Sequence, residues 1–354
     1  MSASSAPSPT PGPSGPATTP DRIPRTGRAV TRRRYGGVEQ VRVEVLDVPE
    51  PGAGEVLVRV GATGLDRGAL HLLTGTPLLA RAAFGLRRPR QPVLGFELAG
   101  TVVAVGAGGA ARSSTPALAP GDRVFGTASG AFAEYAVARP DQLAPVPEAV
   151  TDEQAATLPV SGGTALLAVE DHARVEAGQR VLVLGASGGV GGFAVQLAAR
   201  RGAEVTGVCS AAKADHVRGL GAAHVVDYAT TTPRDLDGPY DAVIDIAGNH
   251  PVRELRRLLT RTGALVVVGG EGGGRVLGGL HRNLAVSVLA PLTHQRLSWF
   301  VTRQTSALHA RLGELVAAGE IRTPIDRTVG LDGVADALAA LQHGTLRGKV
   351  AIRP

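Results

Sequence analysis

The chain is poor in cysteine and has no long apolar run. Its single cysteine, Cys209, excludes an internal disulfide and a structural zinc site built from cysteines. No apolar stretch approaches the roughly 18 residues that a bilayer-spanning helix needs, so a transmembrane protein is excluded. The first residues also lack the apolar segment of a secretory signal peptide, and we therefore expect a cytoplasmic protein.

Acidic residues are scarce at the N-terminus, and this explains the net charge of +6. Residues 1–35 contain six arginines and one acid, Asp21, whereas the rest of the chain is close to neutral. A basic arm could bind RNA or a membrane surface, but a solvated tail is the simpler interpretation. Residues 1–27 are mostly small, polar or proline, and such a composition cannot bury enough apolar surface to fold. We expect a disordered tail there, with neither a nucleic-acid nor a membrane partner.

A glycine-rich segment in the middle of the chain is the most informative feature. Residues 181–184 are four consecutive apolar residues, as in a strand buried on both faces. The turn Gly185-Ala186-Ser187-Gly188-Gly189-Val190-Gly191 follows, and a helical apolar pattern begins at Phe193. Glycines let the backbone approach a pyrophosphate, whose charge is stabilised at a helix N-terminus. The segment predicts a dinucleotide site, and a plain loop between core elements is the alternative.

The spacing of the apolar segments predicts two domains. Residues 28–151 show short strands and frequent turns, which are typical of an antiparallel, barrel-like β domain. Residues 152–299 alternate between strands and helices, as in a doubly wound parallel sheet. Its strands are expected at 181–184, 205–209, 224–227, 241–246 and 264–268. Residues 300–354 return to short elements, and residues 349–352 are expected to add a strand to the first domain.

The end of the second parallel strand indicates which dinucleotide binds. In an NAD site, an acid about 20 residues beyond the glycines binds the ribose 2′-hydroxyl. Here Ser210 follows the strand, Lys213 lies nearby, and no acid is present. A hydroxyl and an ammonium group suit a 2′-phosphate, so the sequence favours NADPH over NADH. Ser210 could instead cap the helix expected from Ala211, and Cys209 is expected to be a small buried residue at the strand end.

Several motifs after residue 28 occur in the order typical of one enzyme family. They are the segments 92–100 (PVLGFELAG), 121–124 (GDRV), 130–135 (GAFAEY), 155–159 (AATLP), 186–191 (ASGGVG), 208–210 (VCS), 226–228 (VDY) and 347–349 (RGK). The chain thereby resembles the zinc-independent quinone oxidoreductase, or zeta-crystallin-like, branch of the medium-chain dehydrogenase/reductase family. The resemblance implies a GroES-like β domain and a Rossmann domain, with cofactor and substrate in the cleft between them.

The resemblance also implies a homodimer and roles for individual residues. The dimer would form at the sheet edge near residues 263–268, although that apolar strand could also be internal. The pyrophosphate would lie against the glycine turn, namely Ser187, Gly188, Gly189 and Val190. The adenosine 2′-phosphate would lie among Ser210, Lys213 and Tyr228, and the nicotinamide end near Gly269 and Arg347. Tyr228 could equally be a strand-end aromatic that packs on the sheet.

A zinc ion is not expected. Zinc-dependent relatives carry a Gly-His-Glu motif and a ligand cysteine, whereas Phe96 takes the place of that histidine and Cys209 lies in the other domain. Phenylalanine has no lone pair to donate, and catalytic zinc usually has three protein ligands. The nine histidines form no spaced ligand cluster. We therefore interpret Glu97 as a buried hydrogen-bonding residue rather than a catalytic acid.

The expected active-site loop departs from the pattern of the family. Many relatives have an Asn-x-x-Asp motif there, but this chain has Asp66-Arg67-Gly68-Ala69. Asp66 would stand where the asparagine faces the substrate, and it could orient a carbonyl through water, relay a proton or simply cap a turn. We take Asp66 as the candidate catalytic residue. His71 is expected to be a core or rim histidine with a hydrogen-bond partner, and residues 81–90 a solvated loop.

These features predict an oxidoreductase that uses NADPH without a metal. Alcohol oxidation is disfavoured when no metal polarises the alcohol oxygen. A quinone or an α,β-unsaturated carbonyl is electrophilic by itself, so it is the expected hydride acceptor. Two alternatives are an enoyl reductase of a biosynthetic pathway and a non-catalytic NADPH-binding sensor.

Overall fold

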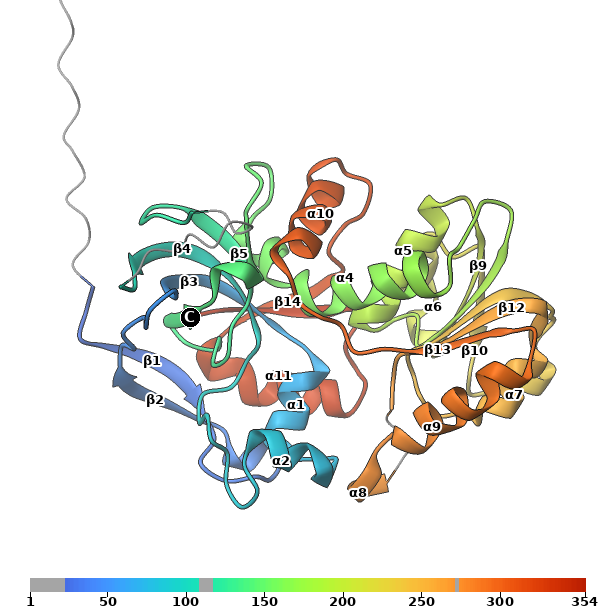
Figure 1. Ribbon diagram of the computed structural model, residues 1–354, viewed down its shortest axis with the longest axis horizontal. Coiled ribbons are helices and arrows are strands. Elements are labelled where there is room, and N and C mark those ends of the chain that lie inside the picture. The colour runs from blue at the N-terminus through green and yellow to red at the C-terminus, as the bar shows by residue number, and fades with distance from the viewer. Residues whose placement is uncertain (1–22, 108–116, 271–273) are drawn as a thin grey trace, which may run out of the picture.

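Two large β-sheets organise residues 23–107, 117–270 and 274–354, which the computed structural model describes (Figure 1). The seven-stranded sheet has the order β14-β15-β3-β4-β5-β7, and β6 also pairs with β3. Its strands are β3 (Val56–Leu65), β4 (Glu97–Val105), β5 (Arg123–Thr127), β6 (Tyr135–Ala138), β7 (Leu143–Pro145), β14 (Ile325–Gly330) and β15 (Lys349–Arg353). All of its pairs are antiparallel except β14 with β15. The last strand therefore joins the early β domain, as predicted.

A two-stranded sheet corrects the prediction for the N-terminal arm. Strand β1 (Thr26–Thr31) pairs with β2 (Arg42–Asp47), so ordered structure begins before residue 28, while residues 1–22 lie outside the described residues. The arginines that follow belong to the fold rather than to a solvated tail. Arg32 is buried and donates hydrogen bonds to the main-chain carbonyls of Leu72 and Gln91. The guanidinium charge of Arg32 can be buried because these carbonyl groups accept its hydrogen bonds. The amino-acid composition of the N-terminal segment does not reveal such partners.

The six-stranded parallel sheet has the order β10-β9-β8-β11-β12-β13. Its strands are β8 (Arg180–Leu184), β9 (Glu204–Cys209), β10 (His224–Asp227), β11 (Tyr240–Asp245), β12 (Leu259–Val267) and β13 (Arg296–Trp299). All five expected strands are present, and β13 is an additional one. Strand β12 lies between β11 and β13, so the strand near residues 263–268 is internal and not an edge. The expectation that it forms a dimer edge is wrong, because β13 covers it.

Helices cover both faces of the parallel sheet, and this explains its continuous apolar strands. Val181 and Val183 face the layer of α4 and α5, whereas Leu182 and Leu184 face the layer of α7 and α9. The helices are α1 (Arg67–Thr74), α2 (Arg81–Phe84), α3 (Asp152–Ala156), α4 (Pro159–Leu166), α5 (Gly189–Arg200), α6 (Ala214–Gly219), α7 (Val252–Arg257), α8 (Gly274–Leu277), α9 (Leu280–Leu289), α10 (Ser306–Ala317) and α11 (Val334–Gln342). In the described parts of the chain, no helix has both the length and the apolar character needed to cross a membrane.

The two large sheets meet where the last strand begins. The amide of Gly348 donates to the carbonyl of Ser187 at 2.8 Å, and Gly348 forms a parallel bridge with Gly188. Gly348 has φ of +90°, and a Cβ there would lie 2.0 Å from the carbonyl oxygen of Pro324. Only glycine fits this position. The contact holds the glycine turn against the start of β15.

Candidate active site

One cleft of about 610 Å³ lies between the two large sheets. A volume of this size is typical of a cofactor or substrate site. Most of the residues singled out in the sequence line it, namely Asp66, Ser187, Gly188, Gly189, Val190, Ser210, Lys213, Tyr228 and Gly269. The fold thus brings together residues that are more than 200 positions apart in the chain.

The glycine turn forms the middle of the cleft at the N-terminus of α5. Gly185 ends the strand with φ of +84°, a conformation that favours glycine. A Cβ on Gly191 would lie 2.0 Å from the carbonyl oxygen of Gly185, so the turn can close this tightly only with glycine there. Gly188 takes the N-cap position of α5, which leaves the N–H groups of the first turn to a ligand.

The carboxyl ends of β9 and β10 form one end of the cleft. Lys213 donates to the main-chain carbonyls of Gly344 and Leu346, at 2.5 and 2.6 Å, and burial lowers its pKa. Ser210 occupies the N-cap position of a short 3-10 helix, but its side chain makes no capping hydrogen bond. Tyr228 is 63% exposed, so it does not pack on the sheet.

Arg347 lies beside this end of the cleft but is not among the residues that line it. Its guanidinium group donates to the main-chain carbonyl of Ala212 at 3.3 Å, in the turn that contains Lys213. The position near Gly269 that the resemblance implied for Arg347 is therefore wrong. Arg347 immediately precedes the glycine that bridges to the turn after β8, so its side chain reaches the neighbouring strand end.

Asp66 forms part of the opposite end of the cleft, at the start of α1. Its Oδ1 accepts a hydrogen bond from the amide of Ala69 at 2.9 Å, which caps the helix. Asp66 also lines the cleft, so the residue caps α1 and contributes to the cleft wall at the same time. Its other oxygen, Oδ2, is buried and has no hydrogen-bond partner among the described residues. Burial raises the pKa of Asp66, while the positive charge of Lys349 acts in the opposite direction.

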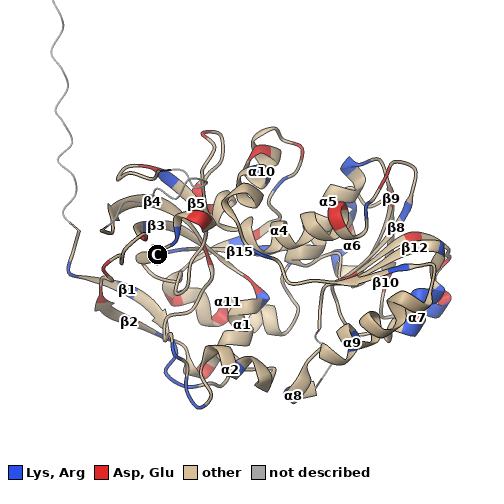
Figure 2. Ribbon diagram, in the orientation of Figure 1, with Lys and Arg blue, Asp and Glu red and all other residues tan. Residues whose placement is uncertain are grey.

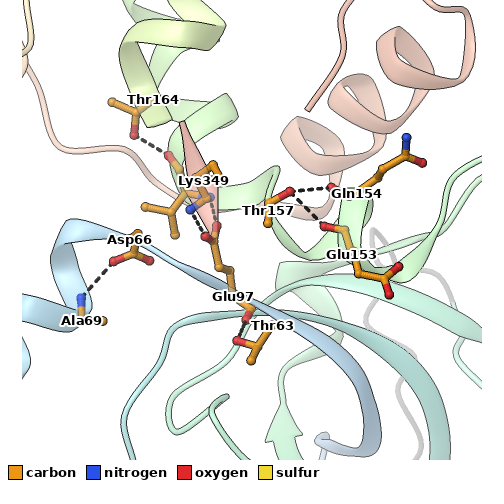
Figure 3. A network of polar contacts seen from close by, with 10 residues as sticks. Thr63, Asp66, Ala69, Glu97, Glu153, Gln154, Thr157, Thr164 and Lys349 are labelled. Carbon is orange, nitrogen blue, oxygen red and sulfur yellow. Dashed lines mark hydrogen bonds and ion pairs between the residues drawn. The ribbon is translucent and has the colours of Figure 1, made fainter. Parts of the chain in front are cut away.

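Glu97 and Lys349 form a buried ion pair beside Asp66 (Figure 3). Oε2 of Glu97 also accepts from the amide of Val160 at 3.0 Å, and both side chains are almost completely buried. Burial, the largest influence, raises the pKa of Glu97 to about 7. The prediction that Glu97 is a buried hydrogen-bonding residue is confirmed. Lys349 lines the cleft but was not predicted as a site residue.

The scarcity of lysine was a signal that could have identified Lys349. The chain has only two lysines, at positions 213 and 349, and both line the cleft. His71 also lines it, and its Nδ1 lies 2.8 Å from the carbonyl oxygen of Thr76, as expected for a rim histidine. Within the expected solvated loop, Arg87, Arg88 and Arg90 are exposed. Arg81 is instead half-buried at the start of α2 and donates to the main-chain carbonyl of Gly75, so the prediction of a solvated loop is wrong for this end of the segment.

The donor groups around Glu97 do not fit a zinc ion. Phe96 contributes no lone pair, and the Glu97 carboxylate already binds the ammonium group of Lys349. A second cation at this carboxylate would be repelled by the first. Within the described ranges, no group of three or more His, Cys, Asp or Glu side chains is arranged to hold a metal ion.

Two family models match the chain. An alcohol dehydrogenase GroES-like domain matches residues 52–148, and a zinc-binding dehydrogenase domain matches residues 220–352. The latter name describes the family model, and the described residues around Glu97 do not offer a donor set that fits zinc. The two matches cover strands of both large sheets.

Individual relatives extend this similarity over nearly the whole chain. The chloroplastic quinone-oxidoreductase QR1 of Triphysaria versicolor is 31% identical over 92% of this chain and 98% of its own. The structure of a quinone oxidoreductase from Coxiella burnetii has a TM-score of 0.79 and 27% identity, and covers 93% of this chain and 99% of that one. The structure of a mycobacterial protein in complex with NADPH has a TM-score of 0.78 and 27% identity. The match covers 93% of this chain and 100% of that one.

Sequence, fold and site geometry agree with one another. The chain combines a GroES-like β domain with a Rossmann-type parallel sheet, and the cleft between them carries the glycine turn. It therefore belongs to the quinone oxidoreductase, or zeta-crystallin-like, branch of the medium-chain dehydrogenase/reductase family.

Proposed function

We propose that the chain is a zinc-independent, NADPH-dependent reductase of quinones or α,β-unsaturated carbonyl compounds. The observation that carries this proposal is the single cleft that joins the glycine turn, the basic end at Lys213 and the buried groups around Asp66. A dinucleotide is long enough to need all three parts. The substrate then occupies the space beside Asp66, at the end of the cleft opposite the adenosine.

The residues along the cleft fit each part of NADPH. Ser187, Gly188, Gly189 and Val190 offer main-chain N–H groups and a helix N-terminus to the pyrophosphate. Ser210, Lys213, Tyr228 and Arg347 surround the 2′-phosphate, where a hydroxyl and cations favour a phosphate over a bare ribose. Gly269 lies in the wall of the nicotinamide end, and a Cβ there would overlap the carbonyl of Ile246.

Substrate chemistry follows from what the cleft contains. Bound NADPH supplies a hydride, and an electrophilic acceptor needs no metal to receive it. The protein aligns the acceptor and excludes water, while Asp66 faces the reacting group. Alcohol oxidation fits less well, because the donor set around Glu97 does not hold a metal that would activate an alcohol.

The test follows the loss of reduced-nicotinamide absorbance by the purified full chain. NADPH and NADH are compared with 1,4-benzoquinone, a simple enone, an enoyl thioester and no acceptor, with and without a metal chelator. We expect acceptor-dependent oxidation that prefers NADPH and resists the chelator. Turnover of the thioester alone would identify an enoyl reductase instead. Tight NADPH binding without turnover on any acceptor would overturn the proposal in favour of a sensor.

A further inference from the structure

Three ionisable side chains meet at the substrate end of the cleft, and their charges do not balance. Asp66 and Glu97 are both buried carboxyl groups, whereas Lys349 is the cation that neutralises them. With both carboxyl groups ionised, Lys349 would balance only one of the two negative charges among these three side chains. Burial of an unpaired charge is costly, so the binding of one proton is favoured.

Hydrogen bonding indicates which oxygen carries that proton. Both oxygens of Glu97 are engaged, Oε1 with the ammonium group of Lys349 and Oε2 with the amide of Val160. Both partners are donors, so they stabilise the ionised form of Glu97. Asp66 differs, because Oδ1 accepts from the amide of Ala69, while Oδ2 is buried and accepts no hydrogen bond from any residue that the structure describes. A proton on Oδ2 of Asp66 therefore disrupts no hydrogen bond.

Other charged groups near Asp66 come from the helix that it caps. Arg67 and His71 lie on α1 and line the same cleft, and His71 lowers the pKa of Asp66 only weakly compared with Lys349. Lys349 on β15 and Glu97 on β4 are the charged groups that face it from the neighbouring sheet. Burial is the dominant influence on both carboxyl groups, and it acts in favour of their neutral forms.

We infer that Asp66 and Glu97 hold one proton between them in the resting protein, beside the ammonium group of Lys349, and that Oδ2 of Asp66 carries it. Asp66 donates this proton to the reduced substrate once rotation of its carboxyl group, which lines the cleft, turns the O–H toward the acceptor. This inference rests on the proposed function. Hydride addition brings two electrons from NADPH and leaves an anion on the acceptor. The O–H bond of Asp66 breaks, and the anion's electron pair forms an O–H bond in a hydroquinone or a C–H bond in a saturated carbonyl compound.

The cluster then regains its proton from solvent after the product leaves. Lys349 stabilises the transient Asp66 carboxylate, and Glu97 is a positioning residue that keeps Lys349 in place and disfavours a second negative charge. An asparagine at this position could hydrogen-bond to a substrate but could not donate a proton in this way. The aspartate therefore adds a proton donor to the active site of this chain.

The variant Asp66→Asn tests the inference with little risk to the fold. Asparagine is as good an N-cap as aspartate, so the hydrogen bond to Ala69 is retained. Infrared difference spectra of the cofactor-free protein, recorded from pH 5 to 9, report the carboxylic-acid C=O stretch directly. We expect this band at pH 7 in the wild type, its absence in Asp66→Asn, and its retention in Asp332→Asn, which changes an exposed carboxylate paired with Arg28. An ionised Asp66 at pH 7 would overturn the inference.

The variant Glu97→Gln tests whether the proton is shared. It keeps an acceptor for the amide of Val160 but removes one negative charge, so Asp66 and Lys349 alone would form a neutral pair. The acid band should then disappear at a lower pH than in the wild type. An unchanged titration would show that the groups do not share a proton.

Turnover separates the two proposals. With a quinone or enone, Asp66→Asn should lower kcat by roughly 10²- to 10⁴-fold, as expected for loss of a general acid, and leave the KM values within a few-fold. The wild-type kcat should fall at alkaline pH, and the variant should lack this dependence. Normal kcat in Asp66→Asn would overturn the proton donation while the proposed function stands. Absence of wild-type turnover would overturn the function, and the infrared titration would still locate the proton.

Discussion

At the scale of single residues, the two lysines have special positions in a chain that otherwise relies on arginine. Both line the cleft, and each ammonium group is held by oxygen atoms from another part of the fold. An ammonium is a compact charge with three donors, whereas a guanidinium is a larger planar group. Arginines occupy surface ion pairs such as Arg28–Asp332, but also a buried one, Arg282–Asp245. The two lysines are therefore distinguished by their place in the cleft rather than by burial alone.

The variant Lys213→Met should change the preference for the cofactor. Loss of one charge-assisted hydrogen bond costs about 1.5–3 kcal/mol, so affinity for NADPH should fall roughly 10- to 100-fold. Affinity for NADH should change little, because NADH has no 2′-phosphate. Calorimetric titration with both cofactors measures this difference.

A matched control for Lys213→Met is Arg218→Met, since Arg218 is an exposed cation on α6 that pairs with Asp215. We expect it to leave both affinities nearly unchanged. Equal weakening of NADPH and NADH by Lys213→Met would mean that Lys213 acts through its bonds to Gly344 and Leu346. Its role would then be to hold the cleft together rather than to select a phosphate.

At the scale of elements, regular apolar patterns in the sequence predicted most of the strands. They did not predict short strands or the pairing of segments that are far apart in the chain. The five parallel strands were predictable because each contains at least two consecutive apolar residues and lies near turn residues. Strand β13 has four residues, Arg296 to Trp299, and too little pattern to identify it. Its presence made the expected dimer edge internal. Whether β12 is an edge strand depends on its pairing with β13, and that pairing cannot be seen in the sequence of β12 alone.

The site was predictable where it is local and not where it depends on distant residues. The glycine turn, Ser210 and Lys213 lie within one β-α-β unit, so sequence spacing alone relates them. Asp66, Glu97 and Lys349 come from three strands or strand ends of the seven-stranded sheet, and the register of that sheet brings them together. No local pattern contains that information. The sequence also did not show whether the hydroxyl of Ser210 caps the following helix. In the structure a short 3-10 helix follows, and the Ser210 side chain makes no capping hydrogen bond.

The glycines of α5 provide a test at this scale. A Cβ on Gly191 would lie 2.0 Å from a carbonyl oxygen of the turn, and the backbone cannot move away without opening it. We expect Gly191→Ala to destabilise the protein by roughly 2–3 kcal/mol and to abolish cofactor binding. Urea denaturation and calorimetric titration measure the two effects.

The neighbouring position is the control. A Cβ on Gly192 would meet only side-chain carbons of Leu220 and Pro324, at 3.2 Å. Alanine favours a helix over glycine by about 1 kcal/mol, which offsets this mild crowding. Gly192→Ala should therefore remain within about 1 kcal/mol of the wild type and bind the cofactor. If both variants behaved alike, the tight turn would not be what requires glycine.

At the scale of the whole molecule, one apolar surface is left uncovered by the residues that the structure describes. It consists of exposed side chains on α8 and α9, namely Val276, Leu277, Leu280, Leu284 and Val288. Figure 2 shows few charges on these helices, and the single charged residue between 276 and 295 is the buried Arg282. The outer strand β13 lies next to α9, and Trp299 donates to Ser287 between them. We expect a second copy of the chain to cover this surface, since apolar patches of this kind are typical of interfaces.

Light scattering coupled to size-exclusion chromatography tests the dimer. The wild type should have the mass of two chains, and Leu284→Glu should shift it toward one chain at micromolar concentration. Val45→Glu is the matched control, because Val45 is 67% exposed on β2 and Leu284 is 66% exposed on α9. A wild-type monomer, or dissociation by both variants alike, would contradict an interface on α8 and α9.

The bridge between Gly348 and the glycine turn has a consequence for biosynthesis. Strand β15 emerges from the ribosome after every other strand of both sheets, yet it carries Lys349 and closes the wall beside Ser187. It pairs with β3, which is translated roughly 290 residues earlier, on the order of 15–60 s at ordinary elongation rates. During that interval the growing chain lacks the strand that carries Lys349 and bridges to the glycine turn. We therefore expect the cleft to be complete only after β15 has been synthesised and has paired with β3.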